Sequence, residues 1–195
     1  MHTSRRFALG GAVGPAAFIG TWATLGATRS GYRPIHDAIS RLAERGAATA
    51  PAMTAGFVVF GTAVPLAAAA FKQHVRGPTW IPTLLTGLAT LGVAATPLDT
   101  SPAIDRLHGV FAGTGYVTLA SIPIAMLPAL TDRSQRVAAV AVTTLSGLSL
   151  AATLAGPAHG FFQRAGLTVG DVWLVSASIG VAAGIGPLRS LRPRR

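Results

Sequence analysis

Residues 51–71 read PAMTAGFVVFGTAVPLAAAAF and contain no charged side chain. A helix of about 20 apolar residues is long enough to cross the roughly 30 Å hydrocarbon core of a bilayer. Five further apolar runs of similar length lie along the chain, at about 7–27, 79–96, 108–130, 137–156 and 170–188. Backbone groups in lipid must be satisfied within helices or closed barrels, and the alternation typical of barrel strands is absent. The sequence therefore predicts an all-α, polytopic membrane protein, a bundle of six transmembrane helices.

The composition supports this class. Of the 195 residues, 50% are hydrophobic and only 11% are charged, and the mean hydropathy is +0.52. Soluble domains carry roughly 25% charged residues, so this chain has too few charges to cover a soluble surface. The absence of cysteine excludes disulfides, thiolate catalysis and cysteine-based metal sites. Residues 1–195 are interpreted as a single membrane domain, whose first apolar run is a retained helix rather than a cleaved signal peptide.

Basic residues are distributed unevenly between the two ends of the predicted helices. If the N-terminus lies inside, ten of the 16 Lys and Arg residues fall in inner segments, while five of the six acids, all but Asp132, fall in outer segments. This asymmetry follows the positive-inside rule and predicts a multi-pass protein of the inner (cytoplasmic) membrane with both termini cytoplasmic. Topology and contact with anionic lipids then account for the net charge of +10, so nucleic acid is not an expected partner.

A polar stretch, GYRPIHDAISRLAERG at residues 31–46, separates the first two apolar runs. Pro34 suits the first turn of a helix and Gly46 suits its end, which predicts a short amphipathic helix in the outer interface. Two interpretations of its polar side chains stay open. Asp37 and its neighbours form ordinary ion pairs along the helix, or His36, Asp37 and Ser40 face a functional site.

The other two outer segments also carry polar side chains. Asp99 ends the third apolar run and His108 opens the fourth, with Asp105 between them as the expected cap of the following helix. Ionisable groups so close to hydrocarbon are costly and usually functional, which favours a site role for Asp99 and His108.

The last outer segment holds His159, Gln163 and Arg164. The Arg164 guanidinium is suited to a phosphate or carboxylate, or it extends to lipid head groups. Asp171 is interpreted as a cap at the start of the sixth span.

Small residues recur at four-residue spacing within three of the apolar runs, at Gly10 and Gly14, Gly109 and Gly113, and Gly180 and Gly184. This spacing lets helices approach closely, and these faces are expected to pack within the bundle.

Several short motifs together resemble a known family. They are Tyr32-Arg-Pro-Ile-His-Asp37-Ala-Ile-Ser40, Pro97-Leu-Asp99 followed by His108-Gly109, and Gln163-Arg164 followed by Trp173. This pattern is similar to the bacterial and archaeal membrane family designated domain of unknown function nine-nine-eight. The resemblance implies a multi-span protein of six helices and supplies positions without roles.

Two classes of function fit these residues. The first is an enzyme that acts on a lipid or isoprenoid-type substrate by acid–base chemistry on the outer face. Its expected catalytic residues are Asp37, Asp99, His108 and His159, and its expected substrate-binding residues are Arg33, Ser40, Gln163 and Arg164. The alternative is a small lipid-binding or transport protein, or a structural or regulatory membrane subunit. The apparent lack of a mid-span charge argues against ion-coupled transport.

No cofactor is expected. His36, His108 and His159 together are a metal site only as a minority interpretation, because no HxxxH or HExxH spacing is present. The expected partners are membrane lipids and a hydrophobic or lipid-linked small molecule, and the sequence leaves the oligomeric state open.

Overall fold

The computed structural model describes residues 3–185. The described helices are α1 (Thr3–Arg6), α2 (Gly10–Thr28), α3 (Ala50–His74), α4 (Trp80–Ala95), α5 (Pro102–Ala125), α6 (Arg133–Ala152) and α7 (His159–Ala183), with short 3-10 helices at Phe7–Leu9, Ile39–Ala43 and Leu127–Ala129. Helix α1, the first 3-10 turn and α2 follow one another without a break and count as one long helix. Together with α3 to α7, residues 3–185 therefore form six long helices. The predicted all-helical class and the predicted number of long helices are confirmed.

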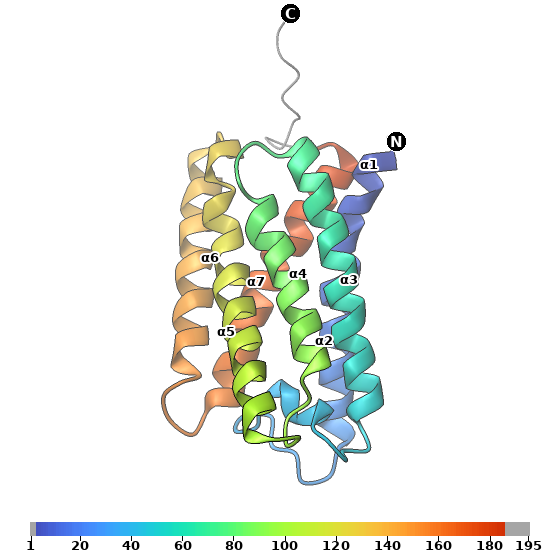
Figure 1. Ribbon diagram of the computed structural model, residues 1–195. Coiled ribbons are helices and arrows are strands. Elements are labelled where there is room, and N and C mark those ends of the chain that lie inside the picture. Colours follow the sequence, from blue (N-terminus) through green and yellow to red (C-terminus); the bar gives the residue numbers. More distant parts are fainter. Residues whose placement is uncertain (1–2, 186–195) are drawn as a thin grey trace, which may run out of the picture.

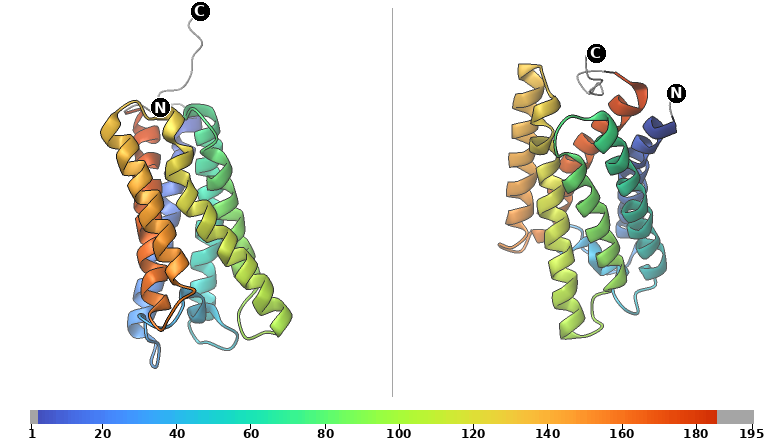
Figure 2. Two further views of the ribbon diagram at one scale, coloured as in Figure 1. Left: turned by 90° about the vertical axis from the view of Figure 1, so that its left-hand side faces the viewer. Right: turned by 45° about the horizontal axis from the view of Figure 1, so that its top comes forward.

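Consecutive helices run in opposite directions and pack side by side (Figures 1 and 2). Helix α7 closes the bundle, because it packs against α2 and α5 as well as α6. Residues 29–49, 96–101 and 153–158 connect the helices at one end of the bundle, at the bottom of Figure 1. We name this end the polar end and residues 29–49 the cap segment. The three polar segments that the sequence singles out therefore lie at one end.

Five described helical stretches are long and apolar enough to cross a membrane, namely Ser4–Thr28, Ala50–His74, Pro102–Ala129, Arg133–Ala152 and His159–Ala183. Helix α4 is a shorter apolar helix of 16 residues. Large apolar side chains point away from the bundle, with Val110, Val117 and Leu148 between 64% and 69% exposed. Such surfaces favour lipid over water, and together these features indicate a multi-pass membrane protein.

The last helix begins earlier than predicted. Helix α7 starts at His159 and not near residue 170, and α6 ends at Ala152 and not near residue 156. The glycines of the first half of α7 serve helix packing: a Cβ added to Gly166 would lie 2.6 Å from Leu150 Cγ. The predicted loop at 157–169 is therefore wrong, and Gln163 and Arg164 are helical residues. The predicted end of this span, near residue 188, lies outside the described residues.

The cap segment is not the continuous amphipathic helix that was predicted between Pro34 and Gly46. Only Ile39–Ala43 is helical, as a 3-10 helix, and Ala38 before it is extended with ψ of 150°. The carbonyls of Pro34 and Asp37 accept hydrogen bonds from Arg164 instead of from later residues of a helix. The chain therefore follows partners on α7 rather than its own helical ladder.

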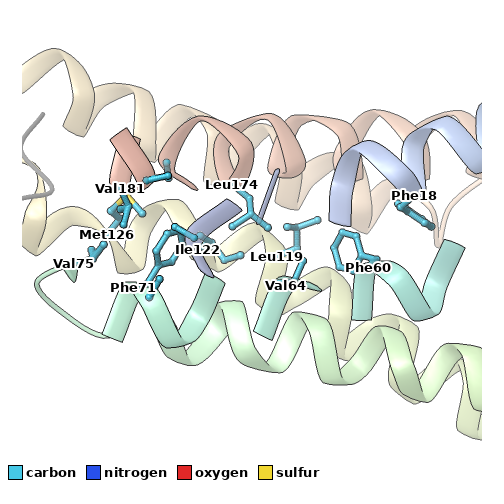
Figure 3. Close-up of a cluster of buried hydrophobic side chains, with 14 of the residues drawn as sticks. Phe18, Phe60, Val64, Phe71, Val75, Leu119, Ile122, Met126, Leu174 and Val181 are labelled. Carbon is cyan, nitrogen blue, oxygen red and sulfur yellow. The ribbon is translucent and has the colours of Figure 1, made fainter. Parts of the chain in front are cut away.

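Apolar side chains from several helices fill the axis of the bundle (Figure 3). Phe18 of α2 and Phe60 of α3 meet edge to face, with ring centroids 5.4 Å apart. Leu119 of α5 and Leu174 of α7 are 1% and 0% exposed near the middle of the bundle. This core fixes the depth at which α7 sits against its neighbours.

The contact between α3 and α4 depends on Gly87, and we predict that Gly87→Ala lowers the thermal unfolding midpoint in detergent. A Cβ at this position would lie 2.4 Å from Pro65 Cδ, so the two helices must move apart. A loss of 1 kcal/mol lowers the midpoint by roughly 2–4 °C in a chain of this size. Gly20→Ala is the control, because a Cβ there meets nothing within 4 Å. Equal midpoints for the two variants would contradict the close packing of α3 against α4.

Candidate functional site

Hydrogen bonds join the cap segment to the connections 96–101 and 153–158 and to the first turn of α7. The Arg45 N–H donates to the Leu98 carbonyl over 2.9 Å, and the Phe161 N–H donates to the Ile35 carbonyl over 3.0 Å. The His36 Nδ1–H donates to the Pro157 carbonyl over 2.6 Å. The cap segment therefore lies across the end of the bundle in a fixed position.

Arg164 on the second turn of α7 holds the cap segment. Its guanidinium donates to the carbonyls of Pro34 and Asp37 over 2.6 and 3.0 Å, and to the Tyr32 hydroxyl. It also lies over the ring of Trp22, 5.3 Å from the centroid. Burial raises the pKa of the Tyr32 hydroxyl, although the Arg164 charge opposes the shift. The predicted substrate-binding guanidinium is thus occupied by the protein's own backbone.

Gln163 makes a second connection between α7 and the cap segment. Its side-chain carbonyl accepts a hydrogen bond of 2.8 Å from the buried Ile39 N–H. Its amide group donates to the hydroxyl of Tyr116 on α5. Gln163, itself 5% exposed, therefore links the cap segment with two helices of the bundle.

His108 and Ser40 form the most buried polar pair of the polar end. The His108 ring is 6% exposed and lies on the second turn of α5, because this helix starts at Pro102. Its Nδ1 is 2.6 Å from the Thr96 carbonyl, which can only accept, so Nδ1 carries the hydrogen. In the neutral ring Nε2 is then an acceptor, and the Ser40 hydroxyl, 2.9 Å away, donates to it.

The predicted catalytic acids have other partners. Asp99 forms an ion pair with Arg41 at 2.7 Å, and its side chain is 53% exposed. Asp37 accepts a hydrogen bond of 2.6 Å from the backbone N–H of Arg33, whose side chain is exposed. Because both ring nitrogens of His108 are bonded to Ser40 and Thr96, neither acid binds that ring. The structure brings Ser40, His108 and Gln163 together and leaves Asp37 and Asp99 at the rim.

Asp105 lies in the first turn of α5, where a negative charge is favourable as predicted, but the hydrogen-bonding cap is Ser101. The Ser101 hydroxyl caps this helix by accepting from the Ile104 N–H, while Asp105 accepts a hydrogen bond of 3.0 Å from the Asp99 N–H. Asp99 has a φ of 61°, a left-handed conformation that is uncommon outside glycine. The Asp105 carboxylate thus supports the turn that presents Asp99 to Arg41.

A cavity of about 50 Å³ lies between the cap segment and the core of the bundle. Ser40 lines it from the cap segment, Tyr116 and Gln163 line it from α5 and α7, and aromatic rings such as Phe18 and Phe111 supply much of the remaining wall. Asp171 lines the same cavity.

The interpretation of Asp171 as a helix cap is wrong. It is the middle residue of α7, which runs from His159 to Ala183, and it is 1% exposed. The sequence argument against ion-coupled transport, which rested on the lack of an ionisable residue in the middle of a span, therefore fails. Gln163 and Asp171 are eight residues apart, a spacing that places both on one helix face. A helix that begins at His159 is the sequence signal that would have predicted this shared face.

A larger groove of about 490 Å³ opens between α5, α6 and α7. Figure 2 shows α5 diverging from α6 and α7 towards the polar end. Gly109 and Gly113 line the groove, and a Cβ added to either would meet nothing within 4 Å, so their predicted role in close packing is wrong. His159 lines the groove at the polar end, and Tyr116 and Gln163 line both the groove and the cavity.

The histidines give no support to a metal site. His36 and His108 each direct Nδ1 at a backbone carbonyl. Among residues 3–185, no group of three or more His, Cys, Asp or Glu side chains is placed to hold a metal ion. A metal at His36, His108 and His159 therefore stays an untested prediction.

The bundle of apolar helices, capped at its polar end, has the helix lengths and composition of a multi-pass membrane protein. Residues 12–180 match the family model described as "Protein of unknown function (DUF998)", and the chain belongs to this family. This confirms the resemblance carried by the motifs around Asp37, Asp99 and Gln163. No curated protein and no solved structure matches the chain.

The ion pairs at the rim predict an acid-sensitive stability. Glu44 lies between Arg29 at 2.5 Å and Arg41 at 3.0 Å. Burial raises the pKa of Glu44, but the two guanidinium groups outweigh it and hold the pKa below the ordinary value of 4.5. The ionised carboxylate therefore stabilises the fold above about pH 4.5, and this contribution is lost as the pH falls through the lower folded value.

We expect Glu44→Gln to lower the thermal midpoint by about 2–4 °C at neutral pH, as for a partly exposed ion pair. The difference from the natural protein should shrink as the pH falls through the lowered folded pKa of Glu44, because the protonated carboxyl group is then as neutral as the glutamine amide. Unfolding followed by circular dichroism across this range measures it. A difference that stays constant with pH would contradict the stabilising role of the ionised carboxylate.

Proposed function

We propose that the protein is a membrane enzyme that cleaves or transfers the acyl group of a lipid-type ester, with Ser40 as nucleophile and His108 as general base. The observation that carries this proposal is a buried series of two hydrogen bonds. The Ser40 hydroxyl donates to His108 Nε2 over 2.9 Å, and His108 Nδ1–H donates to the Thr96 carbonyl over 2.6 Å. A hydroxyl bonded to a base that is oriented by a third group is the arrangement that activates serine nucleophiles.

The proposed reaction has two balanced stages. In the first, Ser40 Oγ attacks the ester carbonyl carbon while its proton passes to His108 Nε2, and the protonated imidazole then gives this proton to the departing alcohol. In the second, His108 takes a proton from water as the water attacks the acyl-serine, and returns it to Ser40 Oγ as the acid leaves. The Thr96 carbonyl keeps the ring oriented throughout, since it accepts from Nδ1–H.

The groove between α5, α6 and α7 supplies a place for the hydrocarbon chain of the substrate. Its volume of about 490 Å³ and its small, apolar lining fit an acyl or isoprenoid chain entering sideways from the bilayer. Tyr116 and Gln163 line both this groove and the cavity that Ser40 lines, so the two spaces are adjacent. We assign His159 at the groove and the exposed Arg33 to the head group of the substrate, and the polar end to the extracytoplasmic face.

The rim acids Asp37 and Asp99, predicted as catalytic, have a supporting role in this proposal. Asp37 fixes the turn that starts at Arg33, and Asp99 holds Arg41, which directly follows Ser40 in the chain. Both position the cap segment that carries the nucleophile.

A second candidate is a lipid-binding protein without catalysis, and the groove is the observation that favours it. In that case Ser40 and His108 only tie the cap segment to α5. The two candidates differ in whether the Ser40 hydroxyl reacts.

The purified full-length protein in mixed micelles tests the enzyme directly. An alkyl fluorophosphonate should label Ser40, as identified by mass spectrometry, and a long-chain nitrophenyl ester should be hydrolysed. We expect Ser40→Ala to abolish both, and His108→Gln to slow both by about 100-fold or more, the usual contribution of a general base. Ser30→Ala is the matched control, because Ser30 is an exposed serine of the same segment.

Labelling at Ser30, or equal hydrolysis by the natural protein and Ser40→Ala, would overturn the assignment of the nucleophile. If no serine is labelled and lipid nevertheless copurifies, in an amount that Gly113→Leu reduces by filling the groove, the binding function replaces the enzyme.

A further inference from the structure

Asp171 stands apart from the proposed reaction and has an unusual environment. It is the middle residue of α7 and is 1% exposed. Both of its carboxyl oxygens are buried, and among the described residues neither has a hydrogen-bond partner. An ionised carboxylate buried without a partner is strongly unfavourable, so this side chain requires either a bound proton or a polar partner in the cavity.

The cavity that Asp171 lines is the second observation. Its volume of about 50 Å³ exceeds the roughly 10–15 Å³ that a cavity needs to hold a water molecule, so water fits in this space. The walls from α2 and α3 are aromatic, at Phe18, Phe57 and Phe60. Helix α4 contributes threonine hydroxyls to the lining but no titratable group. The titratable group that α5 contributes is Tyr116, and the one that α7 contributes is Asp171 itself. Within residues 3–185, no basic side chain lines this space.

We propose that Asp171 is a proton-binding site in the interior of the bundle, protonated at neutral pH and hydrated by water in the cavity. A neutral carboxyl group avoids the cost of a charge among aromatic rings, and water satisfies its two oxygens. The proton is the ligand that requires nothing further from the protein.

The lining of the cavity supports a proton rather than a metal cation. The Thr90 hydroxyl donates to the Thr86 carbonyl over 2.9 Å and keeps its lone pairs as acceptors, whereas the Thr86 hydroxyl oxygen is 2.8 Å from the Pro82 carbonyl and 2.9 Å from the Thr118 hydroxyl oxygen. These acceptors suit the O–H of a carboxylic acid or of water. A hard metal cation would need several oxygen ligands around it, whereas most of this wall is hydrocarbon.

The cavity also gives the proton a way to the polar end. Ser40 lines it on the side of the cap segment, and Asp171 lines it eight residues deeper than Gln163, or about 12 Å along α7. Ser40 is bonded to His108 in turn. Water in the cavity would thus connect a titratable group near the surface with one in the middle of the bundle.

Infrared spectroscopy of the full-length protein in detergent tests this site. At about pH 7 we expect a carboxylic acid C=O band that Asp171→Asn lacks, because exposed carboxyl groups are ionised there. The band should shift within minutes in D₂O if water reaches the group, and it should be lost reversibly at alkaline pH. Asp132→Asn is the matched control, because Asp132 is an exposed acid at the start of α6 and its replacement should leave the band unchanged.

A spectrum at about pH 7 without any band that Asp171→Asn removes would overturn the proposal, since Asp171 would then be ionised. If sodium chloride then raises the thermal midpoint of the natural protein but not of Asp171→Asn, the site binds a cation instead. Should Asp171→Asn fail to fold, Asp171→Glu gives the same decision, because a protonated glutamate must move the band in frequency. A band that stays unshifted in D₂O for hours would contradict the hydrated cavity.

Discussion

A segment without regular helix at the edge of an apolar bundle must find partners for its backbone groups, and this constraint organises the polar end. Two adjacent residues of α7 meet it. Gln163 accepts from the Ile39 N–H, and Arg164 donates to the carbonyls of Pro34 and Asp37. Because these partners are fixed on a helix, the cap segment acquires one position over the bundle, and Ser40 meets His108 there.

The same helix connects the polar end to the interior. Gln163, Leu167 and Asp171 follow one another at four-residue spacing and line one cavity. Tyr116, bonded to Gln163, lies between that cavity and the lateral groove. A change in the groove therefore has a physical route, through Tyr116 and Gln163, both to the cap segment and to the surroundings of Asp171.

Apolar periodicity predicts the number of helices and their antiparallel order, because a run of about 20 apolar residues has few other solutions in lipid. It also places Ser40, His108 and Gln163 at one end. It misjudges the start of α7, since glycines that pack against the cap segment, Leu150 and Leu119 resemble a loop in the sequence. The predicted position of Asp171 at a helix start is wrong for the same reason. The contact of Ile39 with Gln163 joins residues 124 positions apart and is beyond any local pattern.

The central claim is that α7 fixes the cap segment through buried polar contacts, and hydrogen exchange at the Ile39 amide tests it most directly. The N–H of this residue is buried and bonded to Gln163. We expect it to exchange at least about 100-fold more slowly than the exposed Gly31 amide of the same segment, and Gln163→Ala to remove most of this protection. Exchange at Ile39 as fast as at Gly31 in the natural protein would contradict a fixed cap segment.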